Sequence, residues 1–539
     1  MTAPTPFRRS STSPGPGTAW RCLAGLALGL SMALLAGCGS LPASPPAPPS
    51  VALPPPPDGS LVQAAARPPG QPADATGVRL LTLGSHALDA RLQLIDRARV
   101  SLDVQYYVLD NDTSGRLMLA RLAAAAARGV RVRLLVDDLY TTHSDELLRA
   151  MAALPGAQVR VFNPFCCARG GGVAARLAAS LFDVYRLNHR MHNKLLLADG
   201  VLAITGGRNI ADDYFQRGAQ HHFVDLDALL AGGVVPGLAE VFDRFWNSPQ
   251  VLPIAVVSPD PRPPGQLRAR LAELTADADH EPMPLPPVDA FGYPPVGPEL
   301  DAGRPAFVWG RGAVLADPPD KLSRDAGRAW RDSLAYDALM RIWTAQQEVT
   351  ITSPYLVPGP LGIEAFEALR RGGVAVTVLT NSLAATDEPL VHTGYARYRP
   401  RLVDAGVQLY ELVPSRARGD RRMNLFASSS GRLHAKTAVV DGRWSFIGTM
   451  NLDPRSRTQN TELGVFIDSE PLARELKRVI DANRQLGALR VRRAPSAPGL
   501  QWVARDEAGE TVHDEEPEST LWLRLHNLLL GVLVPEQLL

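Results

Sequence analysis

The chain has 539 residues, 45% of them hydrophobic and 21% charged, a balance that is typical of a globular protein and excludes a largely disordered one. Its length exceeds what a single hydrophobic core usually organises, so we expect two domains of about 200 residues each. The formal net charge of +1 argues against a general nucleic-acid-binding protein, because such proteins usually carry a marked basic excess.

The N-terminus has the pattern of a secretory signal peptide, which we predict for residues 1–37. Arginines precede an apolar run at 22–36, and this run is shorter than the roughly 20 residues that a membrane-spanning helix needs. It ends in Leu-Ala-Gly-Cys at Leu35 to Cys38, which resembles the bacterial lipobox, where the cysteine is lipidated and becomes the first mature residue. A short uncleaved anchor is the alternative. Both interpretations predict a protein of the bacterial cell envelope, tethered to the outer or inner membrane and facing the periplasm.

Residues 38–76 follow as a predicted proline-rich tether. Proline occupies half of the positions in 41–58. This composition favours a semi-rigid polyproline helix, which cannot contribute to a core and would hold the body some tens of ångströms from the bilayer.

Two cysteines lie in the body, and they are adjacent. Neighbouring cysteines such as Cys166 and Cys167 rarely form a disulfide without strain, so we interpret them as packing residues. No Cys/His cluster has the spacing of a metal site, and neither a metal ion nor another cofactor is expected.

The body contains two copies of a strand–helix–strand pattern. In the first copy an Ala/Leu-rich helix that ends at Gly129 lies between two strands, the predicted elements being 101–109, 114–127 and 130–136. In the second copy the same order recurs at 348–353, 361–371 and 374–380. A proline-rich stretch at 258–304 separates the copies and is predicted to be a linker. The pattern predicts an α/β protein with two tandem domains, 77–257 and 305–539.

Each copy contains the motif His-x-Lys-x4-Asp, with Gly at +14 and Asn at +17 from the histidine. The motif residues are His192, Lys194, Asp199 and Asn209 in the first copy and His434, Lys436, Asp441 and Asn451 in the second. The chain has four lysines, and the motif uses two of them. About 0.005 chance matches to the core motif would be expected, so two copies with the same extension are not accidental.

The spacing predicts that both copies build one site. An Asp-Gly turn follows each motif and indicates a hairpin, and residues i and i+2 of a strand share a face. Two copies that meet across a pseudo-twofold axis would surround one cavity with two imidazoles, two ammonium groups and two amides. This set suits a phosphodiester. One histidine would attack phosphorus to form a phosphohistidine, the other would act as acid and base, and the lysines and asparagines would stabilise oxygen charge.

The motif carboxylates are expected to do less chemistry than the histidines. Asp199 and Asp441 sit at the hairpin turns, and we interpret them as mainly structural. Asp225 and Glu462, which follow the first and second motifs, are better candidates for binding the second ring nitrogen of a histidine and setting its tautomer.

These motifs resemble the HKD motif of the phospholipase D superfamily, and the resemblance covers residues 77–534. Within the superfamily the chain is similar to the cardiolipin synthase C group, through stretches such as RMHNKLLLADG, GGRNIADDYF and GTMNLDPRSRTQNTELGVFI. One departure is that Gly207 and Thr449 stand where the superfamily often has serine, and both residues are small. The resemblance implies two tandem phospholipase D-type domains, each a mixed β-sheet flanked by helices, with one shared active site.

The resemblance also implies a phosphatidyl transferase that makes cardiolipin from membrane phospholipids. Phosphatidylglycerol would be the acceptor, and phosphatidylethanolamine or phosphatidylglycerol the donor. His192 would be the nucleophile and His434 the acid/base, an order that the symmetry of the motifs leaves open. Lys321, His392 and Tyr395 would line the headgroup site, with a surface or packing role as the alternative. The apolar tail at 519–532 is interpreted as core, with an amphipathic helix resting on lipid as the alternative.

Three other functions compete with this one. A phospholipase D hydrolase would use the same residues with water as the acceptor, and would differ in how well its cavity excludes water. A nuclease of the superfamily is disfavoured by the duplicated chain, the lipid anchor and the near-neutral charge. A non-enzymatic envelope scaffold is disfavoured by the intact motifs in both halves. The sequence makes no prediction of an oligomeric state.

Overall fold

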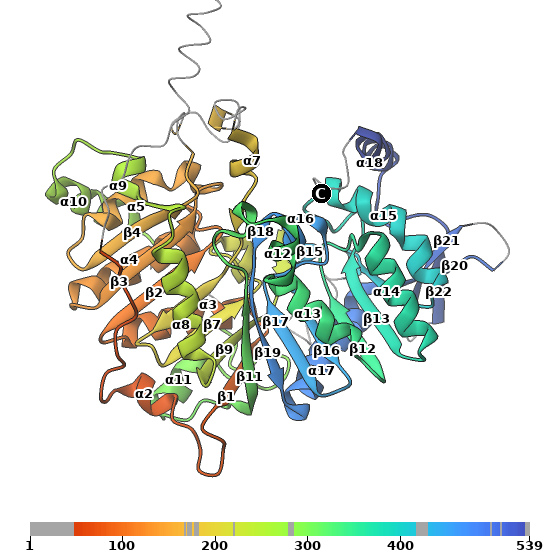
Figure 1. Ribbon diagram of the computed structural model, residues 1–539, viewed down its shortest axis with the longest axis horizontal. Helices are drawn as coiled ribbons and strands as arrows, with labels where there is room; N and C mark the ends of the chain where they lie inside the picture. Colours follow the sequence, from red (N-terminus) through yellow and green to blue (C-terminus); the bar gives the residue numbers. More distant parts are fainter. Residues whose placement is uncertain are drawn as a thin grey trace, which may run out of the picture.

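The structure is a computed structural model, and it describes residues 48–165, 169, 175–176, 183–218, 221–278, 285–416, 430–495, 499–506 and 509–533 (Figure 1). The predicted signal peptide, the lipidation site Cys38 and the pair Cys166 and Cys167 lie outside the described residues.

The strands of both halves form one continuous series of hydrogen-bonded neighbours (Figure 1). The first half contributes, in spatial order, β10 (Val251–Pro253), β4 (Ala157–Phe162), β3 (Arg131–Asp137), β2 (Ser101–Tyr106), β6 (Leu195–Ala198), β7 (Leu202–Gly206), β9 (Asp227–Gly232) and β1 (Ala75–Leu81). The second half continues with β11 (Val308–Ala316), β19 (Leu463–Asp468), β17 (Trp444–Gly448), β16 (Thr437–Val440), β12 (Glu348–Thr352), β13 (Ala375–Asn381), β14 (Gln408–Leu412), β20 (Ala488–Arg493), β21 (Leu500–Asp506) and β22 (Gly509–His513).

The strand order confirms the duplication. In each half three neighbouring strands are parallel, β2–β3–β4 and β12–β13–β14, and their other neighbours are antiparallel. The halves join where β1 pairs antiparallel with β11, with Gly77 opposite Trp309. Two equivalent mixed sheets that meet through an antiparallel strand pair are related by a pseudo-twofold axis, as the motif copies predicted.

Helices cover these sheets in three hydrophobic clusters. The outer faces are covered by α3 (Gly84–Arg97), α4 (Thr113–Ala127) and α5 (Asp145–Ala152) in the first half and by α13 (Leu334–Trp343), α14 (Gly359–Arg371) and α15 (Pro389–Asp404) in the second. A third cluster is shared by both halves and contains α8 (Val235–Trp246) and α17 (Glu470–Gly487). Along β6, Leu195 and Leu197 enter the shared cluster while Leu196 and Ala198 enter the outer one, because side chains alternate across a strand.

The segment 258–304 is not the linker or long loop that its prolines indicated. It contains α10 (Pro264–Thr275) and α11 (Val296–Asp301), after α9 (Ile254–Val257). Leu267 and Leu271 of α10 are buried against the first half. Pro264 stands in the first turn of α10, where a helix needs no N–H donor, so its presence did not exclude a helix.

Part of the predicted tether is also bound to the first half. The Ala52 amide donates to Asp243 Oδ2 at 2.8 Å, and Arg133 Nη1 donates to the Ser50 carbonyl at 2.8 Å. A short helix, α2 (Ser60–Ala64), follows and buries Leu61. The buried side chain of Arg133 and the partly buried one of Asp243 therefore hold residues 50–52 of the predicted tether against the first half.

The apolar tail forms α18 (Leu521–Leu533), which lies beside α15 (Figure 1). Core packing was the wrong interpretation for one side of this helix, because Leu521 and Trp522 are 77% and 72% exposed. Leu525 and Leu529 are also exposed. The exposed side of this helix is therefore apolar. Within the described part of the chain, no helix has the length and apolar character to span a bilayer.

Candidate active site

Both motif copies face one cavity of about 530 Å³ at the junction of the halves. His192 and Asn209 line it from the first half, and His434 and Asn451 from the second. Two small parallel pairs bring these residues together: β5 (Arg190–Met191) with β18 (Asn460–Thr461), and β8 (His221–Val224) with β15 (Ser430–Leu433). Each pair joins the segment before one histidine to the segment that follows the motif of the other half.

This crossing pairs each histidine with a carboxylate from the opposite half. His192 Nδ1 lies 2.8 Å from Glu462 Oε2, and His434 Nδ1 lies 2.7 Å from Asp225 Oδ2. An ionised carboxylate accepts a hydrogen bond from Nδ1–H, which leaves Nε2 of a neutral imidazole with its lone pair available. Asp225 and Glu462 were predicted to orient the histidines, and the structure places both in contact with the rings.

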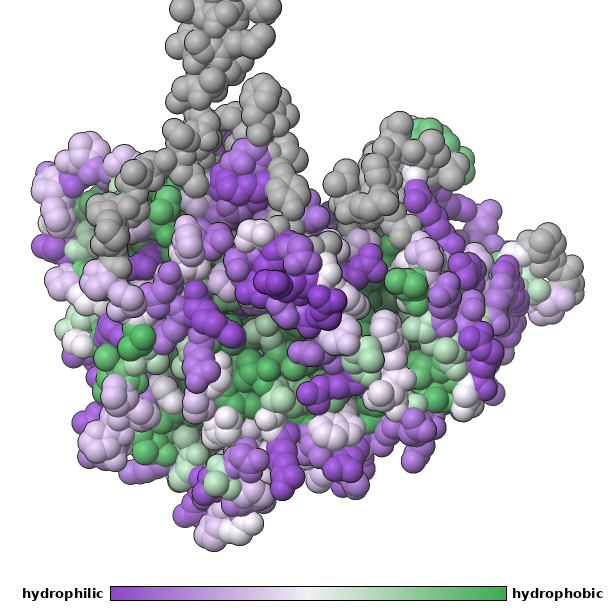
Figure 2. Space-filling view, in the orientation of Figure 1, coloured by the Kyte–Doolittle hydropathy of each residue, from purple (hydrophilic) through white to green (hydrophobic). Residues whose placement is uncertain are grey.

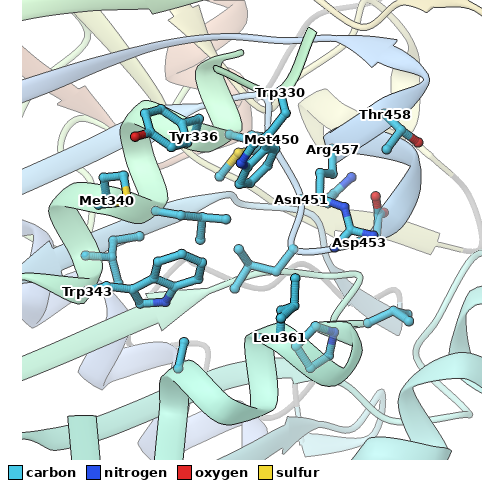
Figure 3. Close-up of a pocket in the computed structure, with 18 of the residues that line it drawn as sticks. Trp330, Tyr336, Met340, Trp343, Leu361, Met450, Asn451, Asp453, Arg457 and Thr458 are labelled. Carbon is cyan, nitrogen blue, oxygen red and sulfur yellow. The ribbon is translucent and has the colours of Figure 1, made fainter. Parts of the chain in front are cut away.

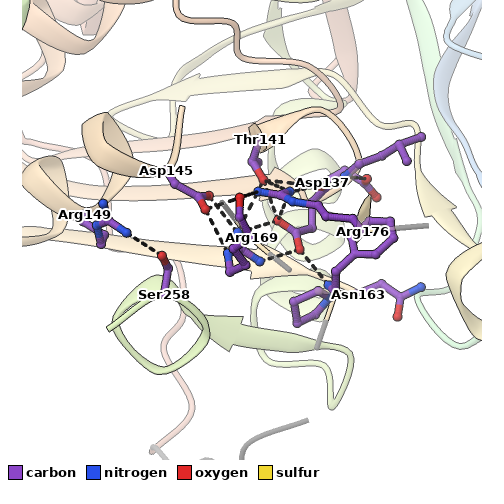
Figure 4. Close-up of polar contacts among 12 residues, drawn as sticks. Asp137, Thr141, Asp145, Arg149, Asn163, Arg169, Arg176 and Ser258 are labelled. Carbon is purple, nitrogen blue, oxygen red and sulfur yellow. Dashed lines mark hydrogen bonds and ion pairs between the residues drawn. The ribbon is translucent and has the colours of Figure 1, made fainter. Parts of the chain in front are cut away.

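Figure 4 shows a buried ionic cluster at the end of β3, in which Arg169 and Arg176 lie against Asp145. The same end of β3 holds the backbone just before His192. Asp137, at the end of β3, accepts a hydrogen bond from the backbone N–H of Met191 at 2.8 Å. It also forms an ion pair with Arg190 at 3.2 Å. The neighbouring Asp138 binds Arg169 at 2.7 Å. The side chains of Asp137 and Arg190 are fully buried, so moving β5 would leave both charges without partners at a high cost in free energy.

The two motif lysines lie against tyrosines that line the same cavity: Lys194 Nζ is 5.3 Å from the centre of the Tyr107 ring, and Lys436 Nζ is 6.0 Å from that of Tyr355. Lys194 Nζ donates to the His192 carbonyl at 2.9 Å, and Lys436 Nζ donates to the His434 carbonyl at 2.5 Å. An ammonium has three N–H donors, so each lysine retains donors for the oxygens of a phosphate. Burial and the charge of Lys436 lower the pKa of Lys194 to about 7, and burial lowers the pKa of Lys436 to about 8.

The motif asparagines complete the lining. The side-chain Nδ2 of Asn209 donates to the Tyr214 hydroxyl at 2.8 Å, and the backbone N–H of Asn451 donates to Ser456 Oγ at 3.1 Å. The cavity is therefore lined by two oriented imidazoles and two asparagines, and two ammonium groups lie next to its tyrosines. The described residues contain no group of three or more His, Cys, Asp or Glu that could hold a metal ion.

Comparison with known proteins agrees with this geometry. Residues 92–246 and 339–483, one segment around each motif copy, match the family described as cardiolipin synthase, PLD-like domain. The chain belongs to this family. Cardiolipin synthase C of Escherichia coli K12 is 39% identical over 457 residues, covering 84% of this chain and 94% of that protein. An uncharacterized protein of Helicobacter pylori 26695 is 32% identical over 457 residues, covering 83% and 86%. The phosphatidylserine synthase structure from Haemophilus influenzae shares the fold, with a TM-score of 0.53, 13% identity and coverage of 86% and 95%.

In this phospholipase D-like chain the motif aspartates lie at turns and not in the cavity. Asp199 has φ +53° and accepts hydrogen bonds from the amides of Arg99, Val100 and Ser101 at 2.7–3.1 Å. Asp441 has φ +51° and binds the equivalent amides before β12. Each carboxylate joins the motif hairpin to the strand beside it, which supports the structural interpretation over a direct role in chemistry.

Asp199→Ala should therefore lower the free energy of unfolding by about 3 kcal/mol, because three amides lose a charged acceptor. Thermal or urea denaturation measures this loss, and Asp441→Ala is the matched variant. Turnover per folded molecule should stay within about twofold of the wild type at a temperature well below melting. A fully folded Asp199→Ala protein without activity would contradict the structural role.

The three residues predicted to bind the headgroup do other work. Lys321 donates all three N–H groups to protein acceptors, Asp317 Oδ2 at 2.9 Å and the carbonyls of Ser456 and Asn460 at 2.9 and 2.8 Å. It therefore has no donor left for a phospholipid. Its three bonds hold the chain that leads to β18 and Glu462.

His392 and Tyr395 lie on α15, and neither lines the catalytic cavity. The His392 ring lies 2.8 Å from Glu516, and the Tyr395 hydroxyl donates to Glu411 at 2.6 Å. These bonds fasten α15 to β14 and to the segment before α18. Neither side chain therefore lines the catalytic cavity. A resemblance in sequence does not show which face of a helix a residue occupies.

Gly207 and Thr449, the small residues that follow the two motifs, each lie against one of the carboxylates that bind the histidines. A Cβ at Gly207 would lie 2.0 Å from Asp225 Oδ1, so only glycine fits there. In the other half the Thr449 hydroxyl donates to Glu462. The shorter side chain, Asp225, therefore lies against a glycine, and the longer one, Glu462, accepts a hydrogen bond from a hydroxyl. The two halves of the site are not chemically identical.

Tyrosines that the motif analysis missed surround the histidines. Tyr107 meets the His192 ring edge-on with 5.0 Å between ring centres, and Tyr214 meets His434 at 5.1 Å. Tyr140 and Tyr355 line the same cavity. Tyr107 and Tyr355 each follow the first strand of the repeated unit, a repeat signal that the sequence carried.

The lowered pKa values of the two motif lysines predict that activity depends on pH. Because the pKa of Lys194 is about 7 and that of Lys436 about 8, both lose their charge as pH rises through this range. We expect kcat/KM, which reports on the free enzyme, to fall above pH about 7. Lys194→Arg should lower the maximal rate but extend activity to higher pH, because arginine stays charged. A kcat/KM of the wild type that stays constant up to pH about 9 would contradict this role.

Proposed function

We propose that this protein is a phosphatidyl transferase that makes cardiolipin through a phosphohistidine intermediate. The observation that carries the proposal is that two carboxylate-bound imidazoles, one from each half, line a single cavity, and that both motif lysines lie against tyrosines of its lining. The name of the Escherichia coli relative, cardiolipin synthase C, supports the lipid product. Phosphatidylglycerol would be the acceptor, and phosphatidylethanolamine or phosphatidylglycerol the donor.

The reaction has two displacements at one phosphorus. Nε2 of one histidine attacks the donor phosphorus, a P–N bond forms, and the P–O bond to the headgroup breaks as the second histidine protonates the leaving oxygen. The hydroxyl of the acceptor phosphatidylglycerol then attacks, its proton passes to the second histidine, and the P–N bond breaks. The ammonium groups of Lys194 and Lys436 stabilise charge on the non-bridging oxygens in both steps.

The unequal carboxylates support His192 as the nucleophile. Burial and the nearby lysines hold the pKa of His192 well below its usual range, which favours the neutral, nucleophilic ring. Burial also raises the pKa of its partner Glu462. Although burial opposes ionisation, His434 and Lys436 hold the pKa of Asp225 at about 2, so Asp225 is ionised. Burial and Lys436 lower the pKa of His434 as well, but the charge of Asp225 opposes this shift and favours the protonated ring. His434 is then the acid in the first step.

We also propose that the protein is a lipoprotein of the bacterial cell envelope, anchored through Cys38 and facing the periplasm. The arginine-rich start, the short apolar run and Leu-Ala-Gly-Cys support this location. The exposed apolar side of α18 is a further surface that could lie on lipid.

One assay tests the activity. The purified protein is incubated with labelled phosphatidylglycerol, with and without phosphatidylethanolamine, and the lipids are separated. Cardiolipin is the expected product, and stimulation by phosphatidylethanolamine would identify that lipid as a donor. Phosphatidic acid alone would make the protein a hydrolase, and cleavage of DNA without lipid turnover would make it a nuclease. No turnover of lipid or DNA would overturn the proposal in favour of a scaffold.

A further inference from the structure

We propose that a second, apolar cavity holds an acyl chain of the acceptor phospholipid, and that Arg457 pairs with the phosphate which this lipid already carries. The inference rests on the proposed phosphatidyl transfer and gives the second lipid a place in the protein. It predicts that this cavity decides whether a lipid or water completes the reaction.

The acceptor cavity, as we call it, has a volume of about 810 Å³ and lies between α12 (Ala326–Arg331), α13 and α14. Tyr336, Met340 and Trp343 of α13 face Leu361 of α14 across it (Figure 3). Its volume falls within the roughly 300–1,000 Å³ of small-molecule sites. Methionine and aromatic side chains offer an adaptable, largely apolar surface, which suits a hydrocarbon chain.

The rim of the acceptor cavity is open and apolar. Leu361 is 70% exposed and Met340 is 42% exposed. Figure 2 shows hydrophobic side chains on this face over α13 and α14, bordered by hydrophilic ones. An exposed apolar rim above a deep apolar cavity is typical of a binding site and not of a surface adapted to water. An acyl chain can enter here without crossing a charged barrier.

The inner end of the acceptor cavity lies next to the catalytic cavity. Asn451 and Asp453 line both. Figure 3 shows these two residues and Arg457 at one end of the acceptor cavity, with Met340 and Trp343 at the other. A lipid whose headgroup passes Asn451 toward the histidines would therefore leave its chain among the apolar side chains. This is the polarity that a glycerophospholipid has.

Arg457 gives this end an unused positive charge. It lies on α16 (Pro454–Thr458), is partly exposed and lines the acceptor cavity but not the catalytic one. Its guanidinium has no hydrogen bond or ion pair to any other residue that the structure describes, whereas that of Arg455 on the same helix donates to Asn188 at 2.8 Å. A guanidinium of this kind is suited to a phosphate.

The position of Arg457 identifies the lipid as the acceptor. The donor phosphate has to lie between the two histidines, because its phosphorus reacts there. A second phosphate site outside the catalytic cavity is of no use to the donor or to water. Phosphatidylglycerol carries its own phosphate beside the glycerol whose hydroxyl attacks the phosphohistidine. Binding at Arg457 would hold that hydroxyl near the site while the phosphate itself does not react.

The test uses the full chain in mixed micelles of labelled phosphatidylglycerol, with ethanol as a second acceptor. Arg457→Gln and Leu361→Glu change the acceptor cavity, and Arg474→Gln and Val512→Glu are matched exposed controls on α17 and β22. We expect each cavity variant to lower the ratio of cardiolipin to phosphatidic acid by about tenfold, while phosphatidylethanol formation stays within about twofold. The controls should resemble the wild type.

Each other outcome overturns a defined part of the inference. Unchanged cardiolipin formation in both cavity variants would remove the acceptor site. Equal loss of cardiolipin and phosphatidylethanol, at an unchanged melting temperature, would assign the cavity to the donor lipid instead. If the wild type formed neither product, the proposed function itself would fail, and the variants would then not be needed to decide it.

Discussion

Replacing either His192 or His434 with alanine is expected to reduce cardiolipin formation by about a thousandfold or more, because each imidazole performs a step that no other group in the cavity can perform. Both rings line the same cavity, and each Nδ1 is occupied by a carboxylate, so each has one nitrogen for chemistry. The initial rate of cardiolipin formation from labelled phosphatidylglycerol measures the loss. Turnover of phospholipid that survives either substitution would show that the two rings do not form one site.

The same variants separate the two roles. A phosphatidyl ester of p-nitrophenol has a leaving group that needs no proton, so the first displacement no longer depends on an acid. With this substrate we expect His434→Ala to release a burst of p-nitrophenol and accumulate the phosphohistidine, whereas His192→Ala should show no burst. A burst in His192→Ala instead would reverse the order of the histidines. No covalent adduct in either variant would contradict a phosphohistidine.

Replacing Glu462 with glutamine should lower kcat by about a hundredfold, although Glu462 touches no substrate. Its carboxylate holds Nδ1 of His192 at 2.8 Å and also accepts the Ser456 hydroxyl at 2.7 Å. An amide can present an N–H to the ring, which favours the wrong tautomer. Asp225→Asn is the matched variant, because Asp225 holds His434 in the same way at 2.7 Å.

A pH profile distinguishes this positioning role from a merely structural one. A carboxylate partner favours the protonated imidazole, so its loss lowers the histidine pKa and moves the acidic limb of kcat/KM to lower pH. A structural defect would lower the melting temperature and leave the limb in place. Activity of Glu462→Gln within about twofold of the wild type would rule out the role.

Much of the fold followed from local patterns. The Ala/Leu-rich run predicted at 114–127 forms α4, because Asp112 caps its first turn and Gly129 takes φ +92° after its end. The Asp-Gly turns at Asp199 and Asp441 join β6 to β7 and β16 to β17 as hairpins. The histidines and lysines, however, lie just before β6 and β16 and not within a strand. The proline content of 258–304 wrongly indicated a loop where α10 forms, because a proline in the first turn is compatible with a helix.

The sequence by itself determined the duplication, the motif and the kind of chemistry, because residue types at short fixed spacings depend only on local geometry. Only the tertiary structure decided that His192 meets Glu462, which is 270 residues away, and that Lys321, His392 and Tyr395 are bound by protein groups outside the catalytic cavity. The acceptor cavity, too, exists only where three helices pack beside the second motif. Contacts of this kind arise from the packing of whole sheets and helices against each other, and no local pattern of side chains records which partner that packing will supply.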